Sequence, residues 1–75
     1  MPVNFSDHAK KQLKRRGISQ KLTIKIVRNP QEILSSFRGR KLRRKRIGGK
    51  LFEVVTRTEG SRITVITAYY LERKI

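Results

Sequence analysis

The sequence lacks several residue types on which small proteins often depend. It has no cysteine, one histidine and five acidic residues in a chain of 75. Without cysteine there is neither a disulfide framework nor a thiolate metal site, and one histidine with scattered carboxylates does not supply a zinc site. No apolar run approaches the ~20 residues that span a bilayer, and the N-terminus lacks the apolar segment of a secretory signal. We therefore expect a soluble cytoplasmic protein with no metal or other cofactor.

What the sequence has in excess is positive charge. Twenty Lys and Arg against five Asp and Glu give a formal net charge of +15. Such an excess opposes folding by self-repulsion and is typical of a protein with a polyanionic partner, nucleic acid first of all. An anionic membrane surface would require a helix with a broad apolar face. In the basic segment 7–16 only Ala9 and Leu13 would form the apolar face of a helix. We therefore expect no membrane binding.

Two helices are predicted in the N-terminal half. Ser6 is suited to cap a helix over 7–16, and Gly17 is suited to end it. The segment 19–29 is ambiguous, because its apolar residues fit both a strand and one face of a helix. Ser19 as a cap and Pro30 as a terminator favour the helix.

The C-terminal half carries strand patterns. Gly48-Gly49 is a typical two-residue hairpin turn, and a second turn is predicted at 58–61. The sequence predicts strands at 31–37, 42–47, 50–58 and 62–72, with residues 2–5 as a candidate fifth strand. We therefore predict one α+β domain over 1–75, with two helices packed on one face of a four-stranded or five-stranded antiparallel sheet.

The most basic stretch lies inside this strand-rich half. Between residues 38 and 46 only Gly39 and Leu42 are not cationic. Such a run can neutralise several phosphates, although it is also a common protection of an edge strand against aggregation. No base-reading motif accompanies it. The candidate nucleic-acid-binding residues are Arg38, Arg40, Lys41, Arg43, Arg44, Lys45 and Arg46.

The tight turn at Gly48-Gly49 fixes the pairing of this run. It places Arg44 opposite Glu53, and it leaves Arg43 and Lys45 on the face of Phe52, toward the helices. Cations are unfavourable in an apolar core. We therefore expect this strand to bulge, to shift its register through a longer loop, or to lie at the sheet edge.

Four residues are candidates for catalysis. His8 changes charge near neutral pH, and it could either accept a proton or tether the first helix to the sheet. Tyr69 and Tyr70 must point to opposite faces of the last strand, so one is expected on an open face, with Arg57 beside it. The alternative for each is simple packing or a surface charge, and Arg16 also fits a cation at the end of a helix.

Several short motifs together resemble a known group of domains. They are F-S-D-H-A at 5–9, R-G-I-S at 16–19, Asn29-Pro30 and V-I-T-A-Y at 65–69. The set resembles a family of small prokaryotic domains of unknown function that is similar to BrnT-type and RelE-like toxins. The resemblance implies a RelE-like fold and a basic ribonuclease that cuts mRNA on the ribosome and is silenced by an acidic antitoxin. It also implies that His8, Arg16 and Tyr69 match recurring family residues.

Two functions follow as hypotheses. In the first, the protein is a toxin-like endoribonuclease in which the 2′-hydroxyl of RNA attacks its own phosphate. His8 or Tyr69 would then move protons, while Arg16, Arg46 and Arg57 would hold the phosphate. In the second, it is a non-catalytic RNA-binding or DNA-binding module that uses the basic strand 38–46.

Overall fold

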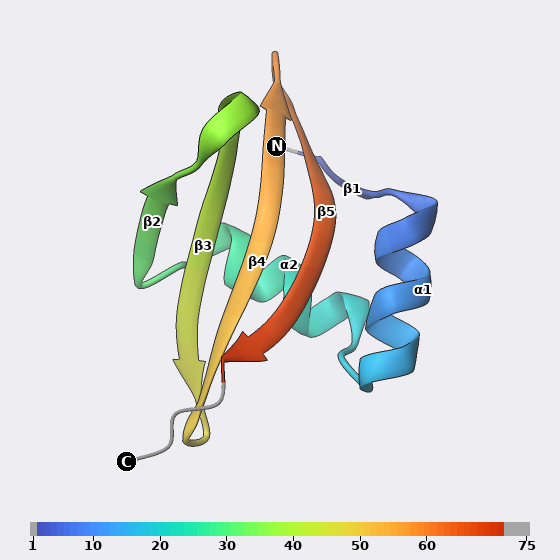
Figure 1. The fold of residues 1–75 in the computed structure, drawn as a ribbon, viewed down its shortest axis with the longest axis vertical. Coiled ribbons are helices and arrows are strands. Elements are labelled where there is room, and N and C mark those ends of the chain that lie inside the picture. The colour runs from blue at the N-terminus through green and yellow to red at the C-terminus, as the bar shows by residue number, and fades with distance from the viewer. Residues whose placement is uncertain (1, 72–75) are drawn as a thin grey trace.

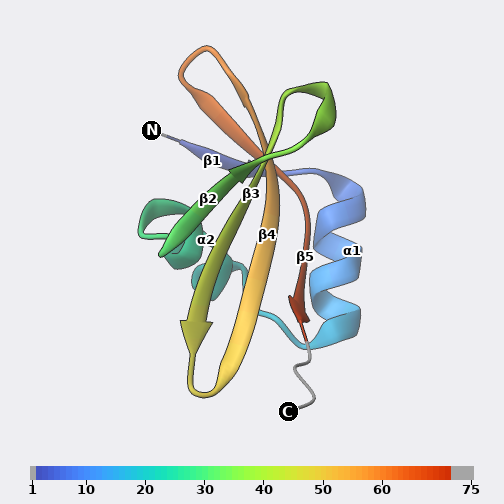
Figure 2. The ribbon, with the colours of Figure 1, turned by 60° about the vertical axis from the view of Figure 1, so that its left-hand side comes forward.

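The computed structural model describes residues 2–71 as a sheet with two helices on one side (Figures 1 and 2). The sheet has the strand order β1-β5-β4-β3-β2. The elements in chain order are β1 (Val3–Phe5), α1 (Asp7–Arg16), α2 (Gln20–Arg28), β2 (Glu32–Ser35), the short 3₁₀ helix η1 (Phe37–Gly39), β3 (Arg40–Ile47), β4 (Lys50–Glu59) and β5 (Arg62–Leu71). This is the predicted α+β architecture with the helices in the N-terminal half. No helix among residues 2–71 has the length and apolarity required to cross a membrane.

Both helices begin where the sequence predicts. The Ser6 hydroxyl accepts a hydrogen bond from the Ala9 N–H at 3.0 Å, and the Ser19 hydroxyl accepts one from the Leu22 N–H at 3.0 Å. Gly17 ends α1 in the left-handed region, with φ of 68°. The ambiguous segment 19–29 is therefore a helix with Ser19 and Asn29 as its caps. The Ser19 hydroxyl satisfies a backbone N–H at the helix start that has no partner within the helix.

The sheet is mixed, which corrects the expectation of a purely antiparallel sheet. The pairs β2–β3, β3–β4 and β4–β5 are antiparallel, whereas β1 pairs with β5 in parallel, Val3 opposite Ile63. Parallel neighbours require a long connection, and here the two helices and three other strands separate β1 from β5 in the chain. The short stretch 2–5 thus closes one side of the sheet rather than extending the meander.

The β3–β4 hairpin has the predicted register. Gly48 and Gly49 both have positive φ, 55° and 81°, as a two-residue turn that follows the twist of the strands requires. Arg44 pairs with Glu53 and Arg46 with Leu51. The turns that precede β3 and follow β4 both lie at the opposite end of the sheet from this hairpin turn (Figure 1).

The expected remedy for the two inward cations of β3 was wrong. This strand lies inside the sheet between β4 and β2, and its pairing with β4 is uninterrupted. Arg43 Nη1 donates instead to the Val27 carbonyl at 3.1 Å, and Lys45 Nζ donates to the Asn29 carbonyl at 2.9 Å. Both acceptors lie at the C-terminal end of α2, where carbonyl groups lack intrahelical partners. The cations therefore cap a helix rather than distort the strand.

The pairing of β4 with β5 contains a bulge. Val55 pairs with Thr67 and Thr56 with Val65, so Ile66 is an extra residue in β5. Val65 and Ala68 are both buried, at 0% and 1% exposure. A strand without the bulge would send residues three apart to opposite faces. The bulge therefore keeps both residues in the core and leaves Tyr69 on the face that the helices do not cover.

The core lies between the helices and the sheet. It is built from these buried side chains: Ala9, Leu13, Ile18, Ile26, Val27, Phe52, Val54, Ile63, Val65 and Ala68. Tyr70 packs against this cluster with its ring 5.2 Å from that of Phe52, edge to face. The two adjacent tyrosines thus point to opposite faces, as predicted.

Candidate functional site on the open face of the sheet

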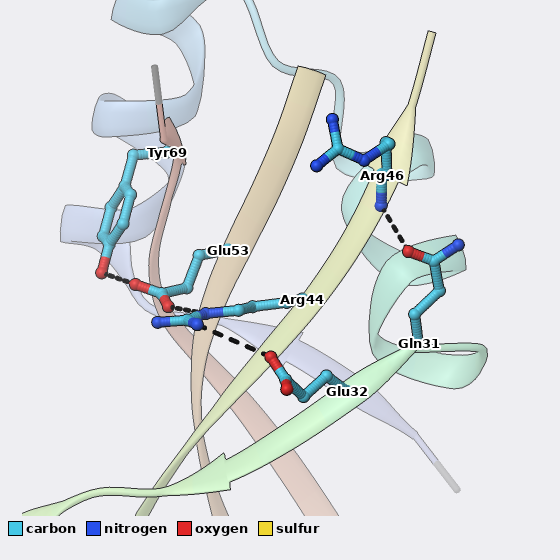
Figure 3. Close-up of polar contacts among 6 residues, drawn as sticks. All are labelled: Gln31, Glu32, Arg44, Arg46, Glu53 and Tyr69. Atoms are coloured by element: carbon cyan, nitrogen blue, oxygen red, sulfur yellow. Dashed lines mark hydrogen bonds and ion pairs between the residues drawn. The ribbon is translucent and has the colours of Figure 1, made fainter. Parts of the chain in front are cut away.

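Four polar side chains form one row across the open face of the sheet. Glu32, Arg44, Glu53 and Tyr69 are successive cross-strand neighbours on β2, β3, β4 and β5. Arg44 Nε donates to Glu53 Oε1 at 2.6 Å, and the Tyr69 hydroxyl donates to Glu53 Oε2 (Figure 3). Arg44 Nη1 lies 3.5 Å from Glu32 Oε1. We call this set the open-face row.

Glu53 is the centre of the row, and it is buried although no helix covers this face. Its side chain is 5% exposed, against 55% for the side chain of Glu32. A buried carboxylate is costly unless it is paired and hydrogen-bonded. Arg44 and Tyr69 satisfy one oxygen each, so the carboxylate is held in a fixed position between a cation and a hydroxyl.

This arrangement changes the acidity of both partners. Burial, followed by the hydrogen bond to Glu53, raises the pKa of Tyr69 from 10.0 to about 12. The hydrogen bond to Glu53 also raises the pKa of Arg44 above its ordinary value. At neutral pH the tyrosine therefore keeps its proton and directs it at Glu53.

Arg16 reaches the row from the last turn of α1. Its Nη1 donates to the Ala68 carbonyl at 2.8 Å and to the Thr67 hydroxyl at 3.2 Å. The guanidinium carbon lies 5.9 Å from the centre of the Tyr69 ring, in range of a cation–π contact. The Tyr70 hydroxyl donates to the Arg16 carbonyl at 2.9 Å. Arg16 is thus more than a cation at a helix end, because it joins α1 to the strand that carries Tyr69.

Further arginines lie along the open face on either side of the row. Arg40 and Arg57 are direct cross-strand neighbours near the turns that flank β3 and β4. Arg57 Nε lies 3.4 Å from Glu59 Oε1, in an exposed ion pair. Arg46 lies at the other end of β3, where its backbone N–H donates to Gln31 Oε1 at 2.9 Å (Figure 3). Arg57 is paired with Glu59, whereas none of the ion pairs among residues 2–71 involves Arg40. Like charges opposite each other are unfavourable, so Arg40 beside Arg57 is suited to a phosphate.

His8 does not belong to this arrangement. Its side chain is exposed in the first turn of α1, where it lines a half-open pocket of about 210 Å³ with Lys11, Gln12 and Arg15. The expected tether of the helix start is provided by the backbone, since the Ser6 N–H donates to the Val65 carbonyl at 3.2 Å. Of the four candidate catalytic residues, the structure brings together Tyr69 and Arg16, places Arg57 on the same face, and leaves His8 outside.

The basic run is divided between the two faces of the sheet. Strand alternation sends Arg40, Arg44 and Arg46 to the open face, and Lys41, Arg43 and Lys45 to the helix side. Arg38 lies in η1 with φ of 61°, a left-handed conformation that is uncommon outside glycine. The seven candidate residues therefore do not form one continuous surface.

Charge is distributed unevenly over the molecule. Eight Lys and Arg lie in α1 and α2 with one acidic residue, Asp7. The open face, in contrast, holds Glu32, Glu53 and Glu59. In the part of the chain that the structure describes, no three His, Cys, Asp or Glu side chains come close enough to hold a metal ion. The open face is therefore a mixed polar site, and the helices carry the strongest positive charge.

Two members of the row were not among the residues selected from the sequence. Glu53 is an acid inside the apolar strand K-L-F-E-V-V, and its pairing with Arg44 was predictable from the hairpin turn. A lone acid at a paired strand position opposite an arginine was the available signal. Glu32 gave no comparable signal, because its place depends on the 3₁₀ turn at η1 that brings β2 beside β3.

The chain matches a family model over residues 5–70, from the end of β1 to Tyr70. The family is described as Domain of unknown function (DUF4258). The chain belongs to this family. The match includes the whole open-face row, so this row belongs to the DUF4258 domain rather than to an added segment. No curated protein and no solved structure matches the chain.

Proposed function

We propose that this DUF4258 domain is an RNA-binding, toxin-like endoribonuclease whose site is the open-face row. The observation that carries the proposal is the buried Glu53 carboxylate, held between the Tyr69 hydroxyl and Arg44 on an otherwise uncovered sheet. A packed, hydrogen-bonded acid–hydroxyl pair that faces solvent is a suitable unit for moving a proton to and from a bound substrate.

The row offers a balanced route for cleavage by the 2′-hydroxyl of RNA. The Tyr69 oxygen accepts the proton of the 2′-hydroxyl while its own proton passes to Glu53 Oε2, to which it is already bonded. The 2′-oxygen attacks the phosphorus, and the bond to the 5′-oxygen breaks. Glu53 then returns its proton through Tyr69 to the leaving 5′-oxygen. With a pKa of about 12, Tyr69 starts each cycle protonated and is a suitable donor to a leaving alkoxide.

The arginines of the open face would provide charge stabilisation. Arg16 is next to Tyr69 and could contact the phosphate that reacts, while Arg57, Arg40 and Arg46 could hold flanking phosphates. Fixed cations near a developing phosphorane are often the largest catalytic contribution. Arg44 is shared by two carboxylates, so its role is to position Glu53 rather than to bind substrate.

The wider context of the proposal comes from the family resemblance and the charge. Two N-terminal helices on one face, with the other face open, agree with a RelE-like arrangement. A toxin of this kind would cut mRNA on the ribosome and would be silenced by an acidic antitoxin. A net charge of +15 supports both an RNA substrate and an acidic protein partner.

Cleavage of defined RNA tests the proposal. The purified protein is incubated with an end-labelled mRNA, free and in a ribosome-based translation mixture, and the products are mapped. Tyr69→Phe and Glu53→Gln should each lower the cleavage rate by at least about 10²-fold. Tyr70→Phe, which changes the tyrosine on the helix side, and His8→Gln should keep the wild-type rate. An RNA with a single 2′-deoxy nucleotide at the cleavage position should resist, because the attacking hydroxyl is absent.

Binding without catalysis is the second candidate, and the charge distribution favours it. The eight cations of α1 and α2 could hold a nucleic acid far from Tyr69. A protein that binds RNA but never cleaves it, with equal affinity in wild type and Tyr69→Phe, would establish this alternative and exclude the endoribonuclease. Equal cleavage by wild type and both row variants would show that the enzyme uses another site.

A further inference from the structure

A half-open cavity of about 310 Å³ lies on the helix side of the sheet, away from the open-face row. Four different elements contribute its lining: Val3 of β1, Val27 and Arg28 at the end of α2, Arg43 of β3, and Ile63 of β5. Small-molecule sites are commonly cavities of roughly 300–1,000 Å³ with apolar walls and a few polar groups. This cavity has the size and composition of the smallest such sites.

The cavity wall holds Arg43, a cation that has no carboxylate partner in the described part of the chain. Arg43 Nε donates to the Thr56 hydroxyl at 3.0 Å, and Nη1 donates to the Val27 carbonyl at 3.1 Å. A guanidinium has five N–H donors, so three remain beyond these two bonds. None of the ion pairs found among residues 2–71 involves Arg43. Burial lowers the pKa of Arg43, as expected for a partly desolvated charge without an anion.

The remaining lining determines what kind of anion would fit. Arg28 adds a second cation, and together the two guanidinium groups outweigh the partial negative charge at the C-terminal end of α2. The remaining lining residues are Val3, Val27 and Ile63, so the other walls are apolar. Val3 is half-buried and is the most exposed of the three, since Val27 and Ile63 are 2% and 6% exposed. A polynucleotide has no apolar body to place there.

We propose that this cavity binds a small amphiphilic anion. The carboxylate or phosphate head of the ligand is held by Arg43 and Arg28, and a short aliphatic body lies against Val3, Val27 and Ile63. Because these residues belong to β1, α2, β3 and β5, the ligand also joins the end of α2 to the sheet. The site is independent of the proposed ribonuclease function.

A set of matched probes tests the proposal by NMR titration of the full chain. Hexanoate and hexyl phosphate carry both features, acetate lacks the aliphatic body, and hexanol lacks the charge. Each buried methylene adds roughly fourfold to affinity. Hexanoate should therefore bind at least about tenfold more tightly than acetate even if only two of its four extra methylenes are buried. Hexanol should not bind. Comparison of hexanoate with hexyl phosphate distinguishes the two head groups.

Two variants and one control separate this site from the general attraction of anions to a basic protein. Arg43→Met should abolish hexanoate binding by removing the head-group donor, and Val3→Phe should abolish it by filling the cavity while Arg43 remains. Arg15→Met lowers the net charge by the same amount, but at an exposed position of α1 that does not line the cavity, so it should leave binding unchanged.

Equal binding of acetate and hexanoate, or an equal loss in Arg15→Met, would overturn the proposal. If Arg43→Met fails to fold, Val3→Phe decides the question. Val3 lies half-buried in a three-residue edge strand, where the sheet should accept a larger side chain. Unchanged RNA cleavage by Val3→Phe would show that the two sites are separate.

Discussion

Arg43 and Arg44 are neighbours in one strand, and the two faces of the sheet surround them in opposite ways. Arg44, on the open face, lies between the carboxylates of Glu53 and Glu32. Arg43, on the helix side, has no carboxylate partner among residues 2–71 and donates instead to the Val27 carbonyl and the Thr56 hydroxyl. The hydrogen bond to Glu53 raises the pKa of Arg44, whereas burial lowers the pKa of Arg43.

The difference shows that position in the sheet, rather than residue type, decides what a cation does here. On the open face the arginine is part of a fixed acid–hydroxyl arrangement that faces solvent. On the helix side, Arg43 donates a hydrogen bond to a carbonyl at the C-terminal end of α2 and leaves part of its charge uncompensated beside a cavity. The first environment suits proton transfer, and the second suits an anionic ligand.

Removal of Glu53 should have the largest effect on this comparison. Glu53→Ala deprives Arg44 and the partly buried Tyr69 hydroxyl of their common acceptor, so we expect a loss of about 3 kcal/mol in the free energy of unfolding. Urea denaturation at neutral pH measures it. Glu59→Ala, at an exposed acid of the same strand, should change stability by less than about 0.5 kcal/mol. Equal effects of the two substitutions would mean that the row is not a cooperative unit.

Replacement of the two arginines compares the faces directly. Arg44→Met leaves the Glu53 carboxylate buried without a cation, although Tyr69 still donates to it, so it should destabilise the protein by an amount close to that of Glu53→Ala. Arg43→Met loses two hydrogen bonds but relieves an unpaired charge, so its stability should stay within about 1 kcal/mol of wild type. Urea denaturation of both variants gives the difference. A larger loss for Arg43→Met than for Arg44→Met would reverse the comparison.

The row should also make stability depend on alkaline pH. The pKa of Tyr69 is about 12 in the folded protein, above its ordinary value of 10.0. A raised pKa contributes stability that is complete below pH 10 and is lost as pH rises toward 12, because the unfolded chain loses this proton first. Unfolding measured from pH 9 to 12 should therefore show a steeper decline for wild type than for Tyr69→Phe. Tyr70→Phe, which keeps Tyr69, should decline like wild type.

Local sequence signals predicted the two helices and the β3–β4 hairpin, because these elements have their own caps and turn. Ser6 and Ser19 bind backbone donors at the helix starts, and Gly48-Gly49 sets a register that already placed Arg44 opposite Glu53. The parallel pairing of β1 could not be predicted in this way. It depends on contacts between residues about sixty positions apart, for which no local pattern exists.

The candidate site was only partly predictable for the same reason. Strand alternation predicted that Tyr69 and Tyr70 point to opposite faces, but the bulge at Ile66 decides that Tyr69 is the one on the open face. The contact of Arg16 with β5 depends on how α1 lies against the sheet. His8 has a side chain suited to proton transfer, but it lies exposed on α1, away from the open-face row. No local sequence pattern indicated this position. The contacts of the inward cations of β3 could not be predicted without knowing where α2 ends. Their acceptors are the carbonyls of Val27, in the last turn of α2, and of Asn29, its C-cap.

The smallest expected effect concerns the arginine pair at the end of the open face. Arg40 and Arg57 lie directly opposite each other, and like charges in this position disfavour the folded sheet. Arg40→Gln should therefore raise the free energy of unfolding by roughly 0.2–1 kcal/mol at low salt, and added salt should shrink the gain because it screens the repulsion.

Arg40→Gln should also weaken RNA binding. The slope of log affinity against log salt concentration should become less steep by the contribution of about one phosphate contact. Urea denaturation and RNA titration at several salt concentrations measure the two effects. Arg62→Gln, at an exposed position opposite Glu59, provides the control, since it removes a cation from a favourable pair and should not stabilise. A stability gain in Arg40→Gln without weaker RNA binding would place the nucleic acid elsewhere, on the cations of the helices.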